Sequence, residues 1–416
     1  MQKTQQALQP MLCLLLTLVL LIPTGLSAQT ELPWLHEFSH IEETSQTPPF
    51  SGQWANSMSV LDDGTRYIGG HLRDEVDFDP GPGTAIYSDD WGDPFVAIYP
   101  PGQPPIVKQF LNPGASVGEV LQVHHDSAGN IYVMGIFGAP NLIIGDGLPD
   151  LIGTGGTPFV AKLNSLGIVQ WAFSLPDSPS TPTVNIMAMN DSQIVIGGRI
   201  SRFGADFDPD PVGVAFAAAG TIRDPDPFIA SYSLNGEFQW VNVMEQLTVG
   251  QGDDGVNALK LTANNQLLVG GSFGSQTDFD GSAGTLTLTS QRIDGYIALY
   301  DSNGTVQWVK QMCGNSDAIA KVERLDYDGN HIVVAGLLVD EVDFDPDPVQ
   351  TELISSNPIN TGDRFIASYT PSGDLNWAGL LDGNTGLEWA DFRISSAGQL
   401  LLAGTVSQFG NHYDLD

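Results

Sequence analysis

Hydrophobic and polar residues alternate in short runs along most of this chain, and the runs come in groups of four. Within residues 256–312, alternating runs at 256–262, 266–273, 295–300 and 305–311 predict four β-strands, because successive side chains of a strand point to opposite faces. Gly, Asn and Asp separate the runs, as they do in tight turns between antiparallel strands. No stretch sustains a helical period, so the pattern predicts an all-β fold.

The group of four strands recurs at a nearly constant interval. Trp171, Trp240, Trp308 and Trp377 are 69, 68 and 69 residues apart. A short apolar run that starts with an aromatic residue precedes each Trp, and a fifth copy of this run leads to Phe110 in place of Trp. A further series of strands ends in glycine, at Gly69-Gly70, Gly135, Gly197-Gly198, Gly270-Gly271, Gly336 and Gly404.

A repeat of four antiparallel strands is typical of the blade of a β-propeller. We therefore predict an all-β propeller of about six blades over residues 29–416, with the last blade incomplete. The Trp side chains are expected to pack between neighbouring blades, and the glycines to allow close backbone approach. The expected blades are residues 53–112, 117–174, 184–244, 256–312, 318–381 and 387–416.

The two ends of the chain suggest how the ring closes. Residues 33–38 have the pattern of a fourth strand, with Trp34 at the Trp position. We expect this segment to be a closing strand and to lie beside residues 387–404 of the last blade. The C-terminal residues 413–416 fall inside an Asp-Phe-Asp motif, so the chain reads as part of a longer protein.

The first residues predict export. Lys3 precedes an apolar run at 11–22, and Leu26-Ser27-Ala28 has the small residues of a cleavage site. Residues 1–28 are thus predicted to be a signal peptide. The protein is expected to be secreted or on the cell surface. Cys313 alone would remain, and we expect it to be a buried, inert thiol.

The charge of the chain restricts its partners. It has 49 acidic and 15 basic residues and a net charge of −34. Such a charge repels nucleic acid and anionic membranes, and no later apolar run is long enough to span a membrane. The expected partners are an extracellular protein or glycan, and we expect a monomer.

The repeat resembles a known family. Residues 226–232 (Asp-Pro-Phe-Ile-Ala-Ser-Tyr), followed by Asn235-Gly236 and Trp240, are similar to the bacterial SBBP-type β-propeller repeats, and residues 126–135 are similar to their other half. The Asp-Phe-Asp-Pro motifs resemble those of large secreted surface proteins of the Bacteroidetes type. The resemblance implies a propeller fold and export to the outside or surface of a Gram-negative bacterium, and it implies no shared catalytic motif.

An acidic motif recurs between the second and third strands, with Asp at alternate positions around a Phe. Carboxylates at this spacing share one side of an extended segment and suit Ca²⁺. The same residues also suit a structural corner in which Phe is buried and Asp caps backbone N–H groups. Both interpretations are open, and calcium is the only cofactor that the sequence suggests. The candidate ligands are Asp77, Asp79, Asp206, Asp208, Asp210, Asp278, Asp280, Asp343, Asp345 and Asp347.

No catalytic residues are predicted. The adjacent His124 and His125 would face opposite sides of a strand, and no Gly-x-Ser-x-Gly nucleophile motif is present. Asp326 to Asn330 has spacing reminiscent of a calcium loop, but its counterparts in other repeats are hairpin turns. The loops after the second and fourth strands are long and share one face. We therefore predict a non-catalytic interaction or adhesion module that binds protein or glycan there. The alternative is a propeller-fold hydrolase or lyase acting on extracellular polysaccharide.

Overall fold

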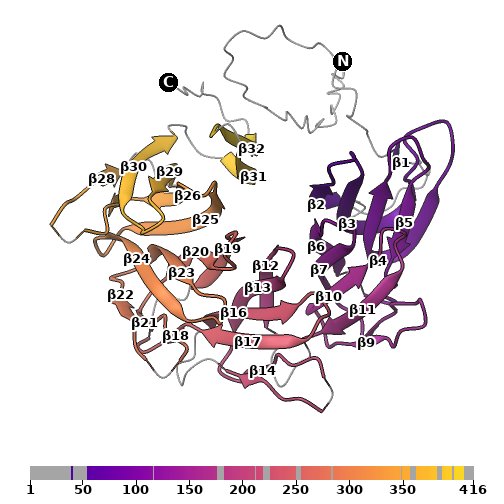
Figure 1. The fold of residues 1–416 in the computed structure, drawn as a ribbon, viewed down its shortest axis with the longest axis horizontal. Coiled ribbons are helices and arrows are strands. Elements are labelled where there is room, and N and C mark those ends of the chain that lie inside the picture. The colour runs from indigo at the N-terminus through magenta and orange to yellow at the C-terminus, as the bar shows by residue number, and fades with distance from the viewer. Residues whose placement is uncertain are drawn as a thin grey trace, which may run out of the picture.

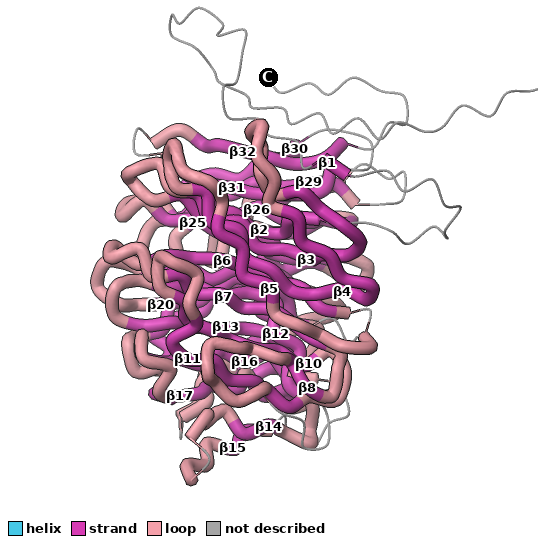
Figure 2. Tube along the Cα trace, turned by 90° about the vertical axis from the view of Figure 1, so that its right-hand side faces the viewer, coloured by secondary structure: helices cyan, strands magenta, loops and turns pink. Residues whose placement is uncertain are grey.

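The computed structural model describes residues 39–40, 54–115, 117–175, 182–210, 212–218, 225–249, 254–282, 284–347, 349–356, 362–381, 387–395 and 398–406. These residues form antiparallel β-sheets and no helix, which confirms the all-β prediction (Figure 2). No helix in these ranges has the length and hydropathy to cross a membrane. The predicted signal peptide and residues 33–38 lie outside the described residues.

Five sheets each contain four strands that are paired in chain order, and the first and the fourth of these sheets have additional strands, described below. Sheet 1 contains β2 (Trp54–Val60), β3 (Arg66–Asp77), β4 (Ile86–Tyr99) and β5 (Ile106–Gln109). Sheet 2 contains β6 (Gly118–His125), β7 (Ile131–Phe137), β10 (Thr157–Leu163) and β11 (Val169–Ser174). Sheet 3 contains β12 (Thr183–Met189), β13 (Gln193–Ile200), β16 (Asp226–Ser233) and β17 (Phe238–Val243). Sheet 4 contains β19 (Gly255–Leu261), β20 (Leu267–Phe273), β23 (Asp294–Tyr300) and β24 (Val306–Gly314). Sheet 5 contains β25 (Ile319–Tyr327), β26 (Ile332–Val339), β29 (Asp363–Tyr369) and β30 (Leu375–Leu381). Sheet 6 has two strands, β31 (Leu387–Ile394) and β32 (Leu400–Val406).

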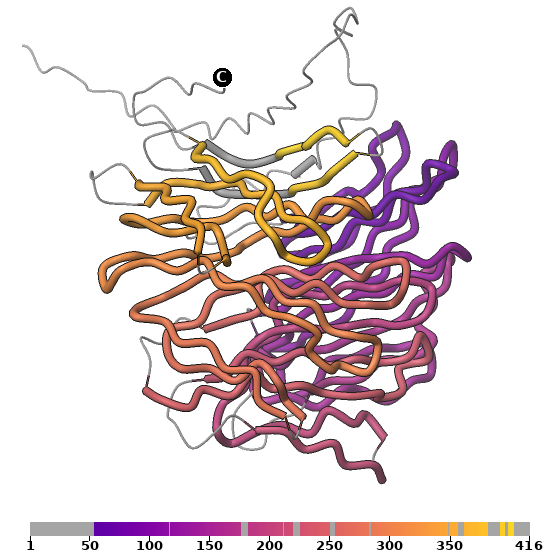
Figure 3. Tube along the Cα trace, turned by 60° about the vertical axis from the view of Figure 1, so that its left-hand side comes forward, coloured from indigo at the N-terminus to yellow at the C-terminus, as the bar shows by residue number. Residues whose placement is uncertain are grey.

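The sheets follow one another in chain order around an arc (Figures 1 and 3). The first strands β2, β6, β12, β19, β25 and β31 contact one another in sequence and lie nearest the centre. The fourth strands lie on the outside. Among the described residues, the arc is open between β31–β32 and β2, and no sheet is closed on itself.

Every first strand carries one extra residue at the same place. Pairing with the second strand skips this residue, which is the signature of a β-bulge. Sheet 6 has the same bulge as the five complete sheets, so its two strands follow the same plan. The skipped residues are Asn56, Leu121, Asn185, Asn257, Glu323 and Ala390.

The glycine series is explained by these bulges. The residue before each bulge pairs with a glycine, for example Val184 with Gly198. A Cβ added to Gly198 would lie 1.8 Å from the carbonyl oxygen of Thr183. The equivalent distances in the other four complete sheets are 1.8–2.3 Å. Only glycine fits below this carbonyl, which confirms the expected close backbone approach.

A second glycine in three sheets lets the next sheet come close. A Cβ on Gly197 would lie 2.7 Å from a methyl group of Val256, at the start of sheet 4. Gly69 and Gly270 have the same relation to Val120 and Val322 of the sheets that follow them. These valines are fully buried, so the paired glycines position neighbouring sheets as well as strands.

Three of the repeated Trp side chains, Trp171, Trp240 and Trp308, pack against the following sheet, as predicted, whereas Trp377 is 50% exposed. The Nε1–H of Trp240 donates to the carbonyl oxygen of Ser302 at 2.9 Å, in the turn between β23 and β24. A Cβ on Gly304 of that turn would lie 2.5 Å from the Trp240 ring. In sheet 1 the strand pairing places Ile106, not Phe110, at this position. The expectation for Phe110 was wrong, since Phe110 lies four residues beyond Ile106; the turn before β5 is also one residue shorter than its counterparts, which places Ile106 rather than Val107 opposite Ile98.

The connections between second and third strands form short hairpins at the rim (Figure 1). The hairpins lie in sheets 2 to 5 and comprise β8 (Asn141–Leu142) with β9 (Leu151–Ile152), β14 (Ala205–Asp206) with β15 (Phe216–Ala217), β21 (Gln276–Asp278) with β22 (Thr287–Thr289), and β27 (Glu341–Asp343) with β28 (Leu353–Ser355).

The first strand of such a hairpin also pairs with the chain at the end of the fourth strand of the preceding sheet. Cys313 at the end of β24 pairs with Asp343 of β27. Glu245, in β18 (Glu245–Gln246), pairs with Asp278 of β21 in the same way. At the N-terminal end of the arc, Ser39 of β1 (Ser39–His40) pairs with Asp77, in the matching part of β3.

Candidate binding face and the Asp-Phe-Asp corners

The first Asp of each Asp-Phe-Asp motif caps backbone. The Oδ1 atom of Asp206 accepts hydrogen bonds from the backbone N–H groups of Asp208, at 3.1 Å, and Ala215, at 2.8 Å. Asp77, Asp278 and Asp343 accept the same two bonds in their own loops. Each of these carboxylates therefore joins the two sides of its loop.

The Phe of the motif is a buried anchor. Phe207 and Phe344 have no exposed surface. The ring of Phe207 packs edge-on against Phe228 of β16, with centroids 4.9 Å apart. The carbonyl oxygen of Phe207 accepts from the hydroxyl of the buried Tyr232 at 3.0 Å. The hydroxyls of Tyr300 and Tyr369 bond to the equivalent carbonyl oxygens in sheets 4 and 5.

The later carboxylates of the motif turn toward their own loops. The Oδ1 atoms of Asp79, Asp208, Asp280 and Asp345 each accept the backbone N–H two residues later, and so do those of Asp210 and Asp347. Within the described ranges, no three His, Cys, Asp or Glu side chains are grouped so that they could hold a metal ion. The calcium interpretation of the ten residues therefore stays a prediction, while the structural contacts of the corner are directly observed.

We expect the corners to respond alike to different cations. Because the carboxylates already accept backbone N–H groups, calcium, magnesium and sodium at equal ionic strength should raise the melting temperature by similar amounts through screening. A rise specific to calcium would contradict this. In that case Asp343→Asn combined with Asp345→Asn should abolish the difference in sheet 5. The single change Asp301→Asn, in a hairpin turn, is the matched control.

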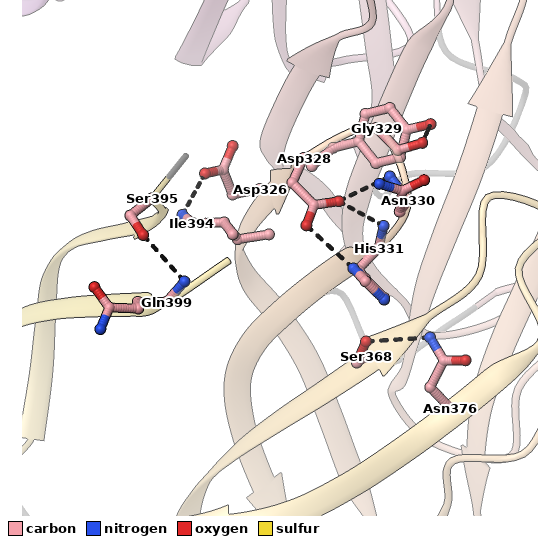
Figure 4. Close-up of polar contacts among 11 residues, drawn as sticks. Asp326, Asp328, Gly329, Asn330, His331, Ser368, Asn376, Ile394, Ser395 and Gln399 are labelled. Carbon is pink, nitrogen blue, oxygen red and sulfur yellow. Dashed lines mark hydrogen bonds and ion pairs between the residues drawn. The ribbon is translucent and has the colours of Figure 1, made fainter. Parts of the chain in front are cut away.

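The calcium-like segment around Asp328 is a hairpin turn, as its counterparts are (Figure 4). The Oδ1 atom of Asp328 accepts from the backbone N–H groups of Asn330, at 2.8 Å, and His331, at 2.7 Å. Its other oxygen lies 3.1 Å from Nδ1 of His331. Partial burial opposes these bonds, but the bonds from Asn330 and His331 hold the pKa of Asp328 below its usual range. All of the carboxylate contacts are thus local.

Near the centre of the arc, side chains of one first strand bind the next. The Oδ2 atom of Asp326 in β25 accepts from the backbone N–H of Ile394 in β31 at 2.7 Å (Figure 4). Its Oδ1 atom lies 2.5 Å from Nζ of Lys260 in β19. Asp326 is buried, so one carboxylate links sheets 4, 5 and 6. Asn257 makes a similar bond to the Val322 carbonyl, at 3.1 Å.

The two adjacent histidines serve this same inter-sheet role. Nε2 of His124 lies 3.1 Å from the Met187 carbonyl oxygen, in β12 of sheet 3. Nδ1 of His125 lies 2.7 Å from Oγ of Ser59, in β2 of sheet 1. Burial, with a smaller effect of Arg393, lowers the pKa of His124 to about 4. The two rings bind opposite neighbours, as their alternation along the strand predicts.

A buried polar position at the start of the third strand was not predicted from the sequence. Asp93, Thr157, Asp226, Asp294 and Asp363 occupy it. Oδ1 of Asp93 accepts the backbone N–H of Asn112 and Oδ2 accepts from the Gln109 side chain, both at 2.7 Å. The sequence signal that could have identified this position is an Asp or Thr that directly precedes a repeated pair, in which Pro, Gly or Arg is followed by an aromatic residue. Asp93 and Asp226 thus hold the segment that follows the fourth strand of their sheets, through the backbone N–H groups of Asn112 and Gln246.

The stability of the fold is expected to fall as the pH rises through about 6. Burial raises the pKa of Asp93 from 3.8 to about 6, and burial also raises the pKa of Asp294. A carboxyl whose pKa is raised on folding stabilises the protein fully below its unfolded pKa, and this contribution is lost as the pH passes the folded pKa. Urea unfolding of wild type and Asp93→Asn at about pH 5 and pH 7 measures it. The fall should be smaller in the variant, and an equal fall in both would contradict the assignment.

The single cysteine outside the predicted signal peptide is not buried. Cys313 lies exposed at the end of β24, so the expectation of a buried thiol was wrong. Met312, directly before it, is buried, so the alternation along β24 turns the Cys313 side chain to the other, exposed side. Partial desolvation, followed by the charges of Asp294 and Asp343, raises the pKa of the thiol, which keeps it protonated and unreactive at neutral pH.

Exposed apolar side chains gather at one end of the sheets. In a meander, the connections between strands 2 and 3 and between successive sheets share one end, here called the long-loop face. The opposite end, called the turn face, carries the tight turns. Of twenty large apolar residues that are exposed among those described, thirteen lie on the long-loop face and two, Leu166 and Ile168, on the turn face. The thirteen are Ile86, Trp91, Leu111, Val117, Ile152, Phe203, Val212, Val214, Phe216, Leu247, Val249, Val349 and Leu353.

Comparisons with known proteins identify no family. No family model matches the chain, and no curated protein matches it. One solved structure that resembles it is a crystal structure of polysaccharide lyase Uly1. The two are 13% identical, the alignment covers 78% of this chain and 76% of the other, and the TM-score is 0.32. A similarity this low carries no argument about fold or function, and the resemblance to SBBP-type repeats stays a prediction.

Proposed function

We propose that this protein is a non-catalytic, exported binding module built on a six-bladed β-propeller, and that it binds a protein through its long-loop face. The concentration of exposed apolar side chains on that face carries the proposal. Large exposed apolar patches on a soluble protein mark interaction surfaces, and a rigid sheet scaffold presents them at little entropic cost. The signal peptide predicted at residues 1–28 supports export.

The propeller part of the proposal is supported by the repeated plan of the sheets. Five meanders stand in chain order around an arc with their first strands at the centre. Sheet 6 begins with the same bulge as the others. The paired glycines and the Trp side chains repeat the same contacts from sheet to sheet. Sheet-to-sheet packing of this kind, continued around an axis, gives a propeller.

The composition of the exposed set favours a protein partner over a glycan. Ten of the thirteen residues are aliphatic, and three, Trp91, Phe203 and Phe216, are aromatic. Sugar rings bind mainly through aromatic platforms and polar groups, whereas aliphatic side chains are covered well by another protein. The densest group is on the hairpin of sheet 3, where Val212 is 89%, Val214 76% and Phe216 57% exposed. With a net charge of −34, the partner is expected to be basic or neutral.

A matched pair of variants tests the proposal. The long-loop variant carries Val212→Ser, Val214→Ser and Phe216→Ser, and the turn-face control carries Leu166→Ser and Ile168→Ser. Wild type and variants are applied to arrays of extracellular-matrix proteins and neutral polysaccharides. We expect binding to a protein that the long-loop variant loses and the control retains. Equal loss of binding in both variants would contradict the proposal. If wild type binds only polysaccharides on the arrays, a protein partner is contradicted and a glycan partner is indicated.

The alternative, a hydrolase or lyase, is tested on the same samples. Incubation with soluble neutral and uronate-containing polysaccharides, followed by assay of reducing ends and unsaturated products, measures turnover. We expect none. Polysaccharide lyases act on anionic uronate polymers, which a chain with a net charge of −34 repels at low ionic strength. Turnover that is lost when long-loop carboxylates are replaced would overturn the non-catalytic assignment.

A further inference from the structure

Two positions of every first strand lie at its end nearest the long-loop face. One is the bulge residue, and the other precedes it by two residues. Asn257, at the bulge of sheet 4, bonds from there to the Val322 carbonyl oxygen of sheet 5. In sheets 1 to 5 the earlier position is occupied by Trp54, Glu119, Thr183, Gly255 and Lys321. Trp54 is the one aromatic residue among these five.

Trp54 has one supported and one exposed ring face. Its indole stacks on the imidazole of His71, with centroids 4.2 Å apart and an interplanar angle of 13°. His71 is buried, and its Nδ1 atom lies 2.7 Å from the Gly118 carbonyl oxygen, so the support is itself fixed. Trp54 is nevertheless 48% exposed. The exposed surface therefore includes the ring face that points away from His71.

A carboxylate is held at the edge of this ring. Oε2 of Glu119 accepts from Nε1–H of Trp54 at 3.1 Å and from the Asn56 side-chain amide at 2.7 Å. Asn56 also donates to the Val120 carbonyl oxygen at 3.0 Å, which anchors it on sheet 2. Because an indole N–H points along the ring plane, Glu119 lies beside the ring and leaves the exposed face uncovered. Its Oε1 atom accepts no hydrogen bond from a residue that the structure describes.

An exposed indole face next to a carboxylate oxygen suits a cation. Trp is the aromatic side chain that attracts cations most strongly, and Oε1 of Glu119 can accept from a donor that lies on the ring. A guanidinium fits both groups because it is planar and carries its donors in its own plane. The net charge of −34 attracts basic partners. A neutral sugar ring also stacks on Trp, but it gains nothing from that charge.

We propose that Trp54 and Glu119 bind an arginine side chain of the protein partner, with the guanidinium stacked on the indole and hydrogen-bonded to Oε1. Asn56 and His71 are positioning residues, because Asn56 holds the carboxylate and His71 supports the ring. This inference rests on the proposed binding of a protein at the long-loop face. It adds the chemistry that the partner presents at the inner ends of the sheets.

Fluorine NMR of the full chain labelled with 5-fluorotryptophan tests the site. The chain has eight Trp residues, and Trp54→Phe assigns the resonance of Trp54. The probe is N-acetylarginine methylamide. Its control is N-acetylcitrulline methylamide, which has nearly the same shape without the charge, and methyl glucoside tests a sugar occupant. Total ionic strength is held constant, because salt screens the charge of the protein.

The arginine derivative should shift the Trp54 resonance saturably and leave the others in place, and the citrulline derivative should shift none. Glu119→Gln should weaken binding of the arginine derivative about tenfold or more, because it removes a charged hydrogen-bond acceptor. Glu237→Gln, the matched change at an exposed turn-face residue, should leave binding unchanged. The Trp resonances away from the site show whether each variant is folded.

Equal shifts with the arginine and citrulline derivatives, or a uniform shift of all Trp resonances, would overturn the proposal. A shift with methyl glucoside alone would assign the ring to a glycan and would also overturn it, as would no shift with any probe. If the arginine derivative fails to bind while the substitutions of Val212, Val214 and Phe216 still abolish protein binding, the proposed function stands and this inference alone is wrong. Binding of the arginine derivative with no protein binding lost in that variant would contradict the proposed function instead.

Discussion

Gly198→Ala is expected to lower the free energy of unfolding by about 3 kcal/mol or more. The added methyl group would lie 1.8 Å from the carbonyl oxygen of Thr183 and 2.8 Å from its carbonyl carbon. These atoms belong to β12 at the point where its bulge begins, and they are fixed by pairing with β13. Relieving this clash therefore requires the backbone of β12 or β13 to move, which would also disturb the contact between sheets 3 and 4.

Gly379→Ala is the matched control for this prediction. Gly379 also lies within a strand, β30, but a Cβ there would meet nothing within 4 Å. The control should leave stability unchanged or raise it by up to about 1 kcal/mol, because alanine restricts the unfolded chain. Urea unfolding of both variants measures the difference. Similar stabilities for the two variants would contradict the bulge as the reason for the glycine series.

Trp240→Ala is expected to lower the free energy of unfolding by about 3 kcal/mol, at the lower end of the range for large aromatic side chains in cores. The ring is half-buried, belongs to the apolar cluster of sheets 3 and 4, and covers Gly304 of the next sheet. The substitution also leaves the Ser302 carbonyl without the indole N–H at 2.9 Å.

Trp377→Ala separates this junction contact from a general effect of losing Trp. Trp377 occupies the same strand position in sheet 5 but is 50% exposed. Its replacement should cost about 1 kcal/mol or less, as surface substitutions do. Thermal or urea unfolding measures both. A cost for Trp377→Ala equal to that for Trp240→Ala would show that the covered turn contributes nothing.

Much of the strand arrangement follows from the sequence because the repeat multiplies weak signals. A single alternating run such as 256–262 predicts a strand only in general terms. The Trp positions, the glycine series and the aromatic starts of third strands recur together, and the ends of the described strands β19, β20, β23 and β24 lie within three residues of those of the expected runs. The turn at Asp328 was likewise understood from its counterparts in other repeats.

The features that the sequence did not reveal depend on pairing between strands. The bulge residues Asn56 and Asn257 share no residue type with Leu121 or Glu323, so composition does not mark them. Ile106 takes the Trp position of sheet 1 because a shortened turn shifts the strand.

Carboxylate roles were also hidden from the sequence. The chain has 49 acidic residues, and the sequence does not show which of them are buried. Only the structure distinguishes the buried Asp93 and Asp294 from the exposed ones. The Asp-Phe-Asp motif was recognised, but its two interpretations use the same residues. Only the hydrogen bonds of Asp206 and the packing of Phe207 display the structural one.

Amide hydrogen exchange on the full chain tests the proposed closed ring most directly. If the ring is closed so that sheet 1 is covered, the amides of β2 should be protected to the same extent as those of the interior first strands β12 and β19. Rapid exchange throughout β2 in wild type, with β12 and β19 protected, would contradict the ring and leave an open arc of sheets.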